Sequence, residues 1–167
     1  TYLCDDVLFL YQGRVTEYLP VSRISETKDE YARRLLEQNQ VMNLTAITDP
    51  LGVCELHFLD SAAVLSQVNL EDSSLIDVGT GAGFPGIPLK ILVPSLQVTL
   101  LDSLNKRVDW LNEVSAQLGL TGVRAIQGRA EEKALEKSMR DSFDLVTARA
   151  VADLRLLSEL CLPFVKV

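Results

Sequence analysis

The alternation of hydrophobic and polar positions changes in kind near residue 73. From Ser74 onward, short runs rich in Val, Ile and Leu alternate with amphipathic stretches, a pattern typical of parallel strands covered by helices. Each run is apolar in the way expected of a strand buried on both faces. The predicted strands are Ser74–Val78, Gln97–Asp102, Val123–Gln127 and Phe143–Thr147. We therefore predict an α/β fold, a parallel sheet with helices on both faces.

Amphipathic stretches after the first three predicted strands give the helices of this part, and Pro or Gly ends two of them. The predicted helices are Gly86–Val93 before Pro94, Lys106–Leu118 before Gly119, a weaker Glu131–Met139, and, after the fourth strand, Leu154–Phe164. The alternation then predicts one more strand, which the sequence up to Val167 does not contain. We therefore expect C-terminal strands of the sheet to be missing.

The part before residue 74 holds no clear strand, and its signals are helical. Thr27-x-x-Glu30 has the spacing of a capping box ahead of an apolar run, and Asp49-Pro50 is a typical helix start for a segment reaching about Leu65. We predict one domain over residues 1–167, in which 1–73 form an N-terminal helical cap and 74–167 an incomplete sheet core.

Composition favours a globular, cytoplasmic protein. In 167 residues, a hydrophobic content of 47% is enough for a real core, and no apolar run approaches the roughly 20 residues that cross a bilayer. The first residues lack the features of a secretory signal. The three cysteines, Cys4, Cys54 and Cys161, are widely spaced, so we expect buried thiols and neither a disulfide framework nor a metal site.

The net charge of −7 argues against a general polyanion binder, because phosphate contacts require clustered Lys and Arg. A nucleic-acid partner would have to meet a local basic surface, although short basic pairs are usually solvated helix faces. The candidates are Arg33-Arg34, Lys106-Arg107, Arg124 with Arg129, and Arg149 with Arg155.

A glycine-rich turn follows the first predicted strand and is the best candidate for a ligand site: Asp77-Val78-Gly79-Thr80-Gly81-Ala82-Gly83. Glycines permit positive φ angles and close backbone approach, and free N–H groups at the next helix start favour a negatively charged group. Asp102 ends the second strand, where a carboxylate can accept hydrogen bonds from both hydroxyls of a ribose. The pattern indicates a nucleoside cofactor.

Two other interpretations fit the turn less well. Gly81-Ala82-Gly83-Phe84-Pro85-Gly86 formally matches the dinucleotide pattern Gly-x-Gly-x-x-Gly, but Gly79 holds the place of its first glycine and Gly81 comes two residues late. A tight turn without a ligand is disfavoured, because three alternating glycines cost backbone entropy. The strand position favours S-adenosylmethionine (SAM) over NAD.

Several further motifs occur in order along the chain. They are Asn39-x-x-x-Asn43-Leu44-Thr45-Ala46-Ile47, His57-Phe58-Leu59-Asp60-Ser61, the turn extended to Pro88, Leu101-Asp102-Ser103-Leu104-x-Lys106-Arg107, Gly128-Arg129-Ala130-Glu131-Glu132, and Phe143-Asp144-x-Val146-x-x-Arg149-Ala150. Together these motifs resemble the RsmG (GidB) family. The resemblance implies a Rossmann-like SAM methyltransferase that modifies N7 of a guanine, conventionally position 527, in the 530 loop of 16S ribosomal RNA. Its partner would be this RNA, expected within the small ribosomal subunit.

The resemblance also implies positions for the cofactor: Gly79 and Phe84 of the turn, Ala130 and Glu131 after the third strand, and Arg149 after the fourth. Gly81, Gly83, Asp102 and Ser103 belong to the same rim, at the carboxyl ends of parallel strands, where open α/β sheets bind ligands. Lys106, Arg107 and Arg149 are the candidate RNA contacts, because they lie at this rim.

No catalytic acid–base pair can be named, which agrees with the implied chemistry. Guanine N7 carries an available lone pair, so catalysis can be positional. His57, the one histidine, is expected to pack or cap. Two other functions stay open: a SAM-dependent methyltransferase of a small molecule or protein, which the acidic charge would suit, and a SAM-sensing module without catalysis.

Overall fold

The computed structural model describes residues 10–11, 14–15 and 21–167, and for 10–11, 14–15, 21–27 and 50–51 it describes the backbone alone. Within the first part, β1 (Leu10–Tyr11) pairs with β2 (Arg14–Val15) in antiparallel register. The expectation of no strand before residue 74 is therefore wrong, since two-residue strands are too short to leave a periodic pattern. The prediction for Cys4 lies outside the described residues.

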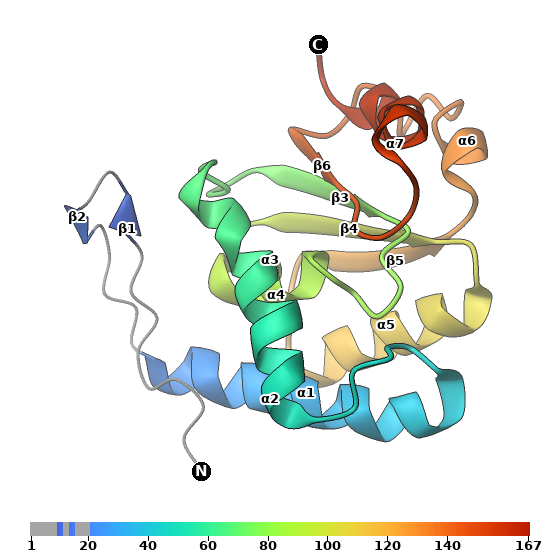
Figure 1. Cartoon of the computed structure of the whole chain (residues 1–167). Helices are drawn as coiled ribbons and strands as arrows, with labels where there is room; N and C mark the ends of the chain where they lie inside the picture. The colour runs from blue at the N-terminus through green and yellow to red at the C-terminus, as the bar shows by residue number, and fades with distance from the viewer. Residues whose placement is uncertain (1–9, 12–13, 16–20) are drawn as a thin grey trace.

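Four parallel strands form the central sheet, in the order β5-β4-β3-β6 (Figure 1). The predicted bounds of β3 (Ser74–Val78), β4 (Gln97–Asp102) and β5 (Val123–Gln127) are confirmed. The last strand, β6, is shorter than predicted and covers Leu145–Thr147. Phe143 instead donates its N–H to Phe164 O at 3.0 Å and forms a parallel bridge with Val165. Its backbone partners therefore lie at the C-terminal end of the chain and not in β3.

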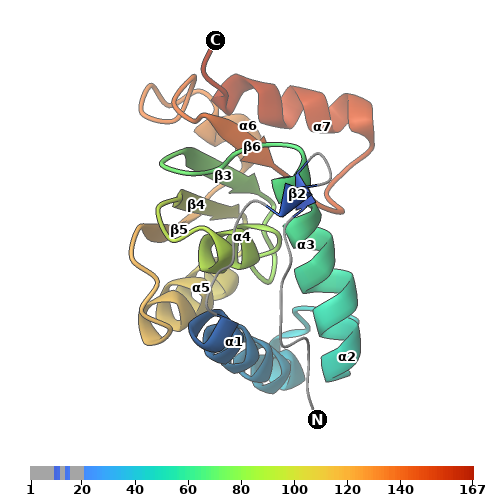
Figure 2. The same ribbon diagram turned by 90° about the vertical axis from the view of Figure 1, so that its left-hand side faces the viewer.

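Helices cover both faces of this sheet, as predicted (Figure 2). On one face lie α4 (Gly86–Leu92) and α5 (Asn105–Gln117), and on the other lie α6 (Ala130–Lys133) and α7 (Leu154–Cys161), which continues as a 3₁₀ turn over Leu162–Phe164. The predicted Glu131–Met139 helix is too long. Leu135 is 78% exposed, so this stretch has no continuous apolar face to hold a longer helix.

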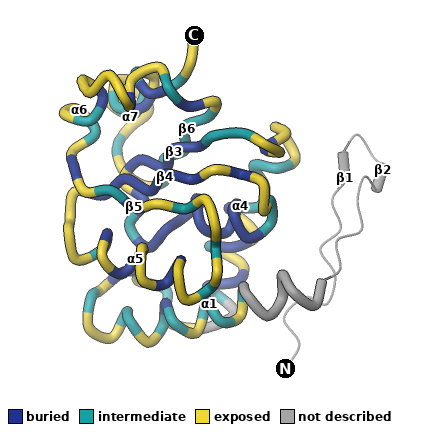
Figure 3. Tube along the Cα trace, turned by 180° about the vertical axis from the view of Figure 1, so that it is seen from behind, coloured by how far each residue is buried: buried dark blue, intermediate teal, exposed yellow. Residues whose placement is uncertain are grey.

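Alternate side chains of the central strands supply two cores. Leu75 and Leu100 join the cluster beneath α4 and α5, while Ile76 and Leu101 join the cluster beneath α7. Figure 3 shows the buried residues concentrated along β3 and β4. The expectation of strands buried on both faces is correct for these two and wrong for β5 and β6. They are the outer strands of the sheet, and β5 exposes Arg124 and Gln127.

The cap consists of α1 (Val21–Met42) and a second, continuous helical segment. This segment runs through α2 (Pro50–Val53), a π-helix (Cys54–Leu59), α3 (Asp60–Ala62) and a 3₁₀ turn (Ala63–Ser66). Its predicted start at Pro50 is confirmed. The capping box at Thr27 is wrong, because α1 begins six residues earlier and the same i, i+3 spacing also occurs inside a helix.

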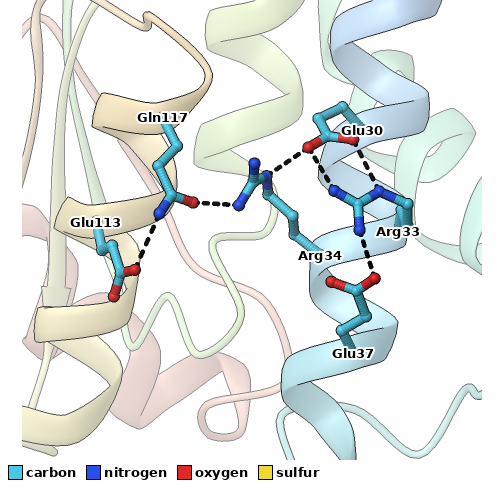
Figure 4. A network of polar contacts seen from close by, with 6 residues as sticks. All are labelled: Glu30, Arg33, Arg34, Glu37, Glu113 and Gln117. Atoms are coloured by element: carbon cyan, nitrogen blue, oxygen red, sulfur yellow. Dashed lines mark hydrogen bonds and ion pairs between the residues drawn. The ribbon is translucent and has the colours of Figure 1, made fainter.

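The cap shares its core with the sheet. Tyr31 and Leu35 of α1 are fully buried in the same cluster as Leu75, Ile87 and Leu100. A polar network on the outside also joins α1 to α5: Glu30 accepts hydrogen bonds from Arg33 and Arg34, and Arg34 donates to Gln117 (Figure 4). The two arginines hold the pKa of Glu30 at about 2.

The structure also bears on the predictions about cysteines, membrane spans and metal sites. Cys54 and Cys161 are buried, as predicted. None of the helices among the described residues is long and apolar enough to span a membrane. Within the same described part of the chain, no group of three or more His, Cys, Asp or Glu side chains is arranged to hold a metal ion.

Candidate functional site

The glycine-rich turn follows β3 at the carboxyl edge of the sheet. Gly79, Gly81 and Gly83 all have positive φ, at 66°, 58° and 88°. The N–H groups of Gly79 and Thr80 both donate to Leu101 O, at 2.9 and 3.1 Å, which ties the turn to the end of β4. A side chain at Gly79 would meet Val151 at 2.6 Å, so the backbone of the turn is approached closely at this point.

The cap supports the turn from the side of α1. The buried Tyr31 hydroxyl donates a hydrogen bond to Ala82 O, and burial raises the pKa of this tyrosine well above its usual value. A Cβ atom at Gly83 would lie 2.8 Å from the same hydroxyl and 2.7 Å from Ile87 Cδ1. Gly83 therefore packs on the inner side of the turn, whereas Gly79 and Gly81 line the cavities of the outer side.

Asp77 fixes the turn to its neighbours from within. Its fully buried carboxylate accepts hydrogen bonds from Thr80 Oγ1 at 2.6 Å, Thr147 Oγ1 at 3.0 Å and Gly86 N at 3.2 Å. Desolvation raises its pKa to about 6, against the usual 3.8. The expectation of free N–H groups at the start of α4 is wrong, because Gly86 N is bound by Asp77 and Ile87 N donates to Gly83 O at 2.7 Å.

A first cavity of about 310 Å³ opens beside the turn, over the ends of β4 and β5. It brings together five of the predicted cofactor residues: Gly79, Asp102, Ser103, Ala130 and Glu131. Asp102 is buried, accepts from Gly81 N at 3.0 Å and Leu104 N at 2.9 Å, and lies 3.5 Å from the Arg107 guanidinium. Glu131 is 59% exposed and stands at the start of α6.

A second cavity of about 520 Å³ adjoins the first and shares Gly79, Arg107 and Ala150 with it. It contains the predicted residues Gly81, Phe84 and Arg149, together with residues of the cap. Among the amides of the turn, that of Ala82 has no acceptor in the described part of the chain. Because Ala82 lines this cavity, its N–H is available to a ligand.

Arg149 joins the core to the cap at the second cavity. Its Nη1 donates to Asp60 Oδ2 at 3.0 Å and Leu56 O at 3.2 Å, and its Nη2 lies 2.8 Å from His57 Nδ1. The guanidinium stands 5.1 Å from the ring centre of Phe84, on which the His57 ring also stacks at 4.4 Å. Burial and the neighbouring Arg149 lower the pKa of His57 below its usual 6.5.

The predicted basic pairs differ in how far their charges are free. Arg33 and Arg34 are paired with Glu30, Arg107 with Asp102 and Arg149 with Asp60. Lys106 is exposed at the start of α5 and forms no ion pair with any residue that the structure describes. Among the predicted contacts, Lys106 is therefore the cation without an ion pair in the described part of the chain, and Arg107 lines both cavities.

Sequence reasoning gave no role to Tyr31 and Thr45, although both support the site. Thr45 lies in the second cavity, and the Asn39 side chain fixes its backbone through Thr45 N at 2.8 Å and Thr45 O at 2.8 Å. The Asn39-x-x-x-Asn43-Leu44-Thr45 motif was the available signal for this loop. The Tyr31 contact joins residues 51 positions apart and left no local signal.

The sequence matches known proteins over most of its length. Residues 24–167 match the family model described as "GidB: rRNA small subunit methyltransferase G". Two curated relatives bear the name Ribosomal RNA small subunit methyltransferase G. One, from Alkaliphilus metalliredigens, is 57% identical over 82% of this chain and 58% of its own length, and one from Streptococcus thermophilus is 51% identical over 84% and 61%. The chain thus spans about three fifths of these relatives.

Solved structures share the fold at low sequence identity. A SAM-dependent methyltransferase from Aquifex aeolicus has a TM-score of 0.54 and 23% identity, covering 81% of this chain and 67% of that one. A protein from Methanococcus maripaludis, provisionally described as a SAM-dependent methyltransferase, has a TM-score of 0.58 and 15% identity, covering 83% and 59%. The chain shares the Rossmann-like α/β fold of these structures.

Proposed function

Because the chain belongs to the rRNA small subunit methyltransferase G family, we propose that it is a SAM-dependent enzyme that methylates 16S ribosomal RNA. In full, the proposal is transfer of a methyl group to N7 of the guanine conventionally numbered 527, in the 530 loop, with the small ribosomal subunit as partner. Such a substrate would place the protein in the cytoplasm. We also propose one domain over residues 1–167, and the core that the described cap residues share with the sheet supports this.

The observation that carries the proposal is the pair of joined cavities at the carboxyl edge of the sheet. Asp102 offers a carboxylate where a ribose would lie, and Ala130 with Glu131 borders the same cavity for the adenine. In the second cavity, the free Ala82 N–H and the Arg149 guanidinium suit the carboxylate of the methionine moiety. Gly79 lines both cavities, which fits a cofactor lying across the turn.

The chain's own residues would act by binding and orientation. When bound, SAM supplies an electrophilic methyl group, which the N7 lone pair of guanine can accept without losing a proton first. Asp102, Glu131 and Arg149 would fix the donor against the sheet, while the rigid turn keeps its place through Asp77 and Tyr31. Orientation of this kind can supply roughly 7–11 kcal/mol of barrier reduction. No acid–base residue is required.

For the RNA, the predicted contacts are Lys106, Arg107 and Arg149. Lys106 supports this part of the proposal best, since its charge is not paired and it stands one residue from Arg107 of the cofactor cavity. Arg107 is paired with Asp102 and Arg149 with Asp60. The proposed main role of both arginines is therefore in the cavities, and their contact with RNA would be secondary. A guanine bound near Arg149 would lie close to the methyl donor.

Incubation with labelled SAM and small ribosomal subunits from a strain without the modification tests this function. We expect label at N7 of the proposed guanine. Label on a protein or small molecule would favour the first alternative, a methyltransferase of another substrate. Tight SAM binding without transfer to any acceptor would favour a sensing module, and the absence of SAM binding would contradict the proposal as a whole.

A further inference from the structure

His57 lies where three separate segments meet. It belongs to the π-helix Cys54–Leu59 of the cap, and its Nε2 lies 2.8 Å from the Thr45 hydroxyl of the preceding loop. Its Nδ1 lies 2.8 Å from Arg149 Nη2, beyond the end of β6. The ring stacks on Phe84 of the glycine-rich turn, with an angle of 19° between the planes. One imidazole therefore joins the cap, the turn and the core.

The contact with Arg149 sets the position of the proton on this ring. A guanidinium has only donors, so His57 Nδ1 must accept and the proton of the neutral ring must be on Nε2. Nε2–H then donates to Thr45 Oγ1, which also accepts from Ile47 N at 3.1 Å. A protonated imidazole would have a donor on both nitrogens and would lose the bond to Arg149.

The segment that carries His57 also supplies the other polar contacts of the Arg149 guanidinium. Leu56 O and Asp60 Oδ2 bind Nη1, and His57 binds Nη2, so the guanidinium is held on both of its terminal nitrogens. Its side chain keeps 27% of its surface exposed and lines the second cavity. The orientation of this cation toward a ligand is thus set by the cap.

We propose that His57 is a positioning residue that, as the neutral Nε2–H tautomer, holds Arg149 in the orientation in which it binds the methyl donor. This inference rests on the proposed function, because it takes SAM as the ligand of the cavity. It predicts that affinity for SAM falls when His57 is protonated. His57 itself needs no contact with the donor or the guanine.

Burial and the charge of Arg149 favour the neutral form of His57, and the charge of Asp60 opposes them less strongly. Arg149 faces it from the end of β6, Asp60 lies on its own helical segment, and Arg107 of α5 lines the same cavity. Thr45 and Phe84 contribute no charge. Burial and Arg149 lower the pKa of His57 from its usual 6.5, so the loss of SAM affinity is expected in the acidic range.

The test uses the fact that His57 is the one histidine of the chain. Its imidazole ¹⁵N shifts, recorded between pH 4.5 and 8, should show the Nε2–H tautomer, and Arg149→Ala should raise the pKa of the ring. The Nδ1–H tautomer in the unaltered protein would overturn the proposal. This measurement needs no ligand and is independent of the proposed function.

Calorimetric titration with SAM completes the test. At pH 8, His57→Phe keeps the stacking on Phe84 but removes both hydrogen bonds, and SAM affinity should fall about tenfold. His57→Gln keeps a hydrogen-bond acceptor and a donor, so its SAM affinity at pH 8 should fall less than about threefold. Because Gln does not titrate, this variant should also lack the further loss of SAM affinity that the unaltered protein shows at acidic pH. Asp77 also titrates in this pH range, but its effect on SAM affinity is the same in His57→Gln and in the unaltered protein. In an Arg149→Ala background, His57→Phe should have no further effect.

The outcomes separate the two proposals. Equal SAM affinity for His57→Phe and the unaltered protein, or the same pH profile for His57→Gln, would show that His57 only packs and would overturn the inference. A tenfold loss that persists in the Arg149→Ala background would also overturn it, since His57 would then act without Arg149. If the unaltered protein binds no SAM while the ¹⁵N shifts are as expected, the proposed function fails, and the contact of His57 with Arg149 stands.

Discussion

Asp77 illustrates how one residue of the glycine motif can serve the structure of a site without touching a ligand. Its carboxylate joins the turn through Thr80, α4 through Gly86 and β6 through Thr147, and it is fully buried. Burial opposes ionisation, and the three donors offset this only in part, so the pKa rises. Asp77, the first residue of the motif, thus holds the turn, α4 and β6 together through its hydrogen bonds.

The raised pKa predicts how stability depends on pH. Between the usual pKa of 3.8 and the folded value of about 6, the folded protein holds a proton on Asp77 that the unfolded chain has lost. The contribution of Asp77 is therefore full below pH 3.8 and declines as pH rises through 6, by roughly 3 kcal/mol in all. Asp77→Asn removes this term.

Urea unfolding at a series of pH values from 4 to 7.5 measures the effect. The free energy of unfolding of the unaltered protein should fall relative to that of Asp77→Asn as the pH rises. Because His57, Glu30 and other groups are the same in both proteins, their titration cancels in the difference. A difference that stays constant over this range would contradict the raised pKa.

Two different kinds of contact hold helix α1 against the sheet core. Leu35 is fully buried in the shared core, whereas its neighbour Arg34 takes part in the polar network with Glu30 and Gln117 (Figure 4). Exposed ion pairs contribute little, because solvent screens them and side-chain entropy opposes them. Apolar burial should dominate.

The neighbouring residues make a matched pair for a test. Leu35→Ala should lower the free energy of unfolding by about 2–5 kcal/mol, the usual cost of a buried cavity. Arg34→Ala should lower it by less than about 1 kcal/mol. Chemical denaturation of the two variants decides between them, and an equal or larger loss for Arg34→Ala would mean that the polar network anchors the cap.

The elements differ in how well the sequence predicted them, for physical reasons. The strands β3, β4 and β5 were predicted with their exact bounds, because apolar runs between turn residues leave a strong local signal. The start of β6 was missed, since the partner of Phe143 is Val165, far along the chain. The start of α1 and the π-helical stretch at His57 were missed, because sequence patterns are least reliable at helix boundaries and do not record a π-helical turn.

The candidate site shows the same division. The glycine turn and Asp102 were named from motif spacing and Glu131 from the family resemblance, and the structure gathers Gly79, Asp102 and Glu131 at one edge. The roles of Gly83, Tyr31 and Thr45 could not be predicted from the sequence, because their contact partners lie in other elements. Arg107 was named as an RNA contact, and its pairing with Asp102 is visible only in the folded chain.

For the molecule as a whole, acidic charge and a polyanionic substrate can coexist only if local cations lie at the site. A net charge of −7 leaves the surface unfavourable to RNA in general, and most arginines near the carboxyl edge are paired with carboxylates. We therefore expect few phosphate contacts and a shallow dependence of RNA affinity on salt. Recognition would then rest on the shape of the subunit around the guanine.

Charge reversal at Lys106 tests this surface. Lys106→Glu should weaken binding to the unmodified subunit and lower the slope of log affinity against log salt by about 1 to 2, while SAM affinity stays the same. Lys137→Glu is the matched control. It is also exposed, but it adjoins Ser138 of a cavity lined by Ser74, Gln97 and Val123, at the opposite edge of the sheet. Equal effects of both variants would contradict a contact at Lys106.

Calorimetric titration of two isosteric variants tests whether SAM binds at the carboxyl edge of the sheet. Asp102→Asn removes a buried carboxylate from the first cavity, while Asp109→Asn removes an exposed one from the same region, next to Asn105 on α5. We expect the dissociation constant of SAM to rise about 10- to 100-fold for Asp102→Asn and less than twofold for Asp109→Asn, with both proteins folded by circular dichroism. Unchanged SAM affinity in folded Asp102→Asn would contradict the claim.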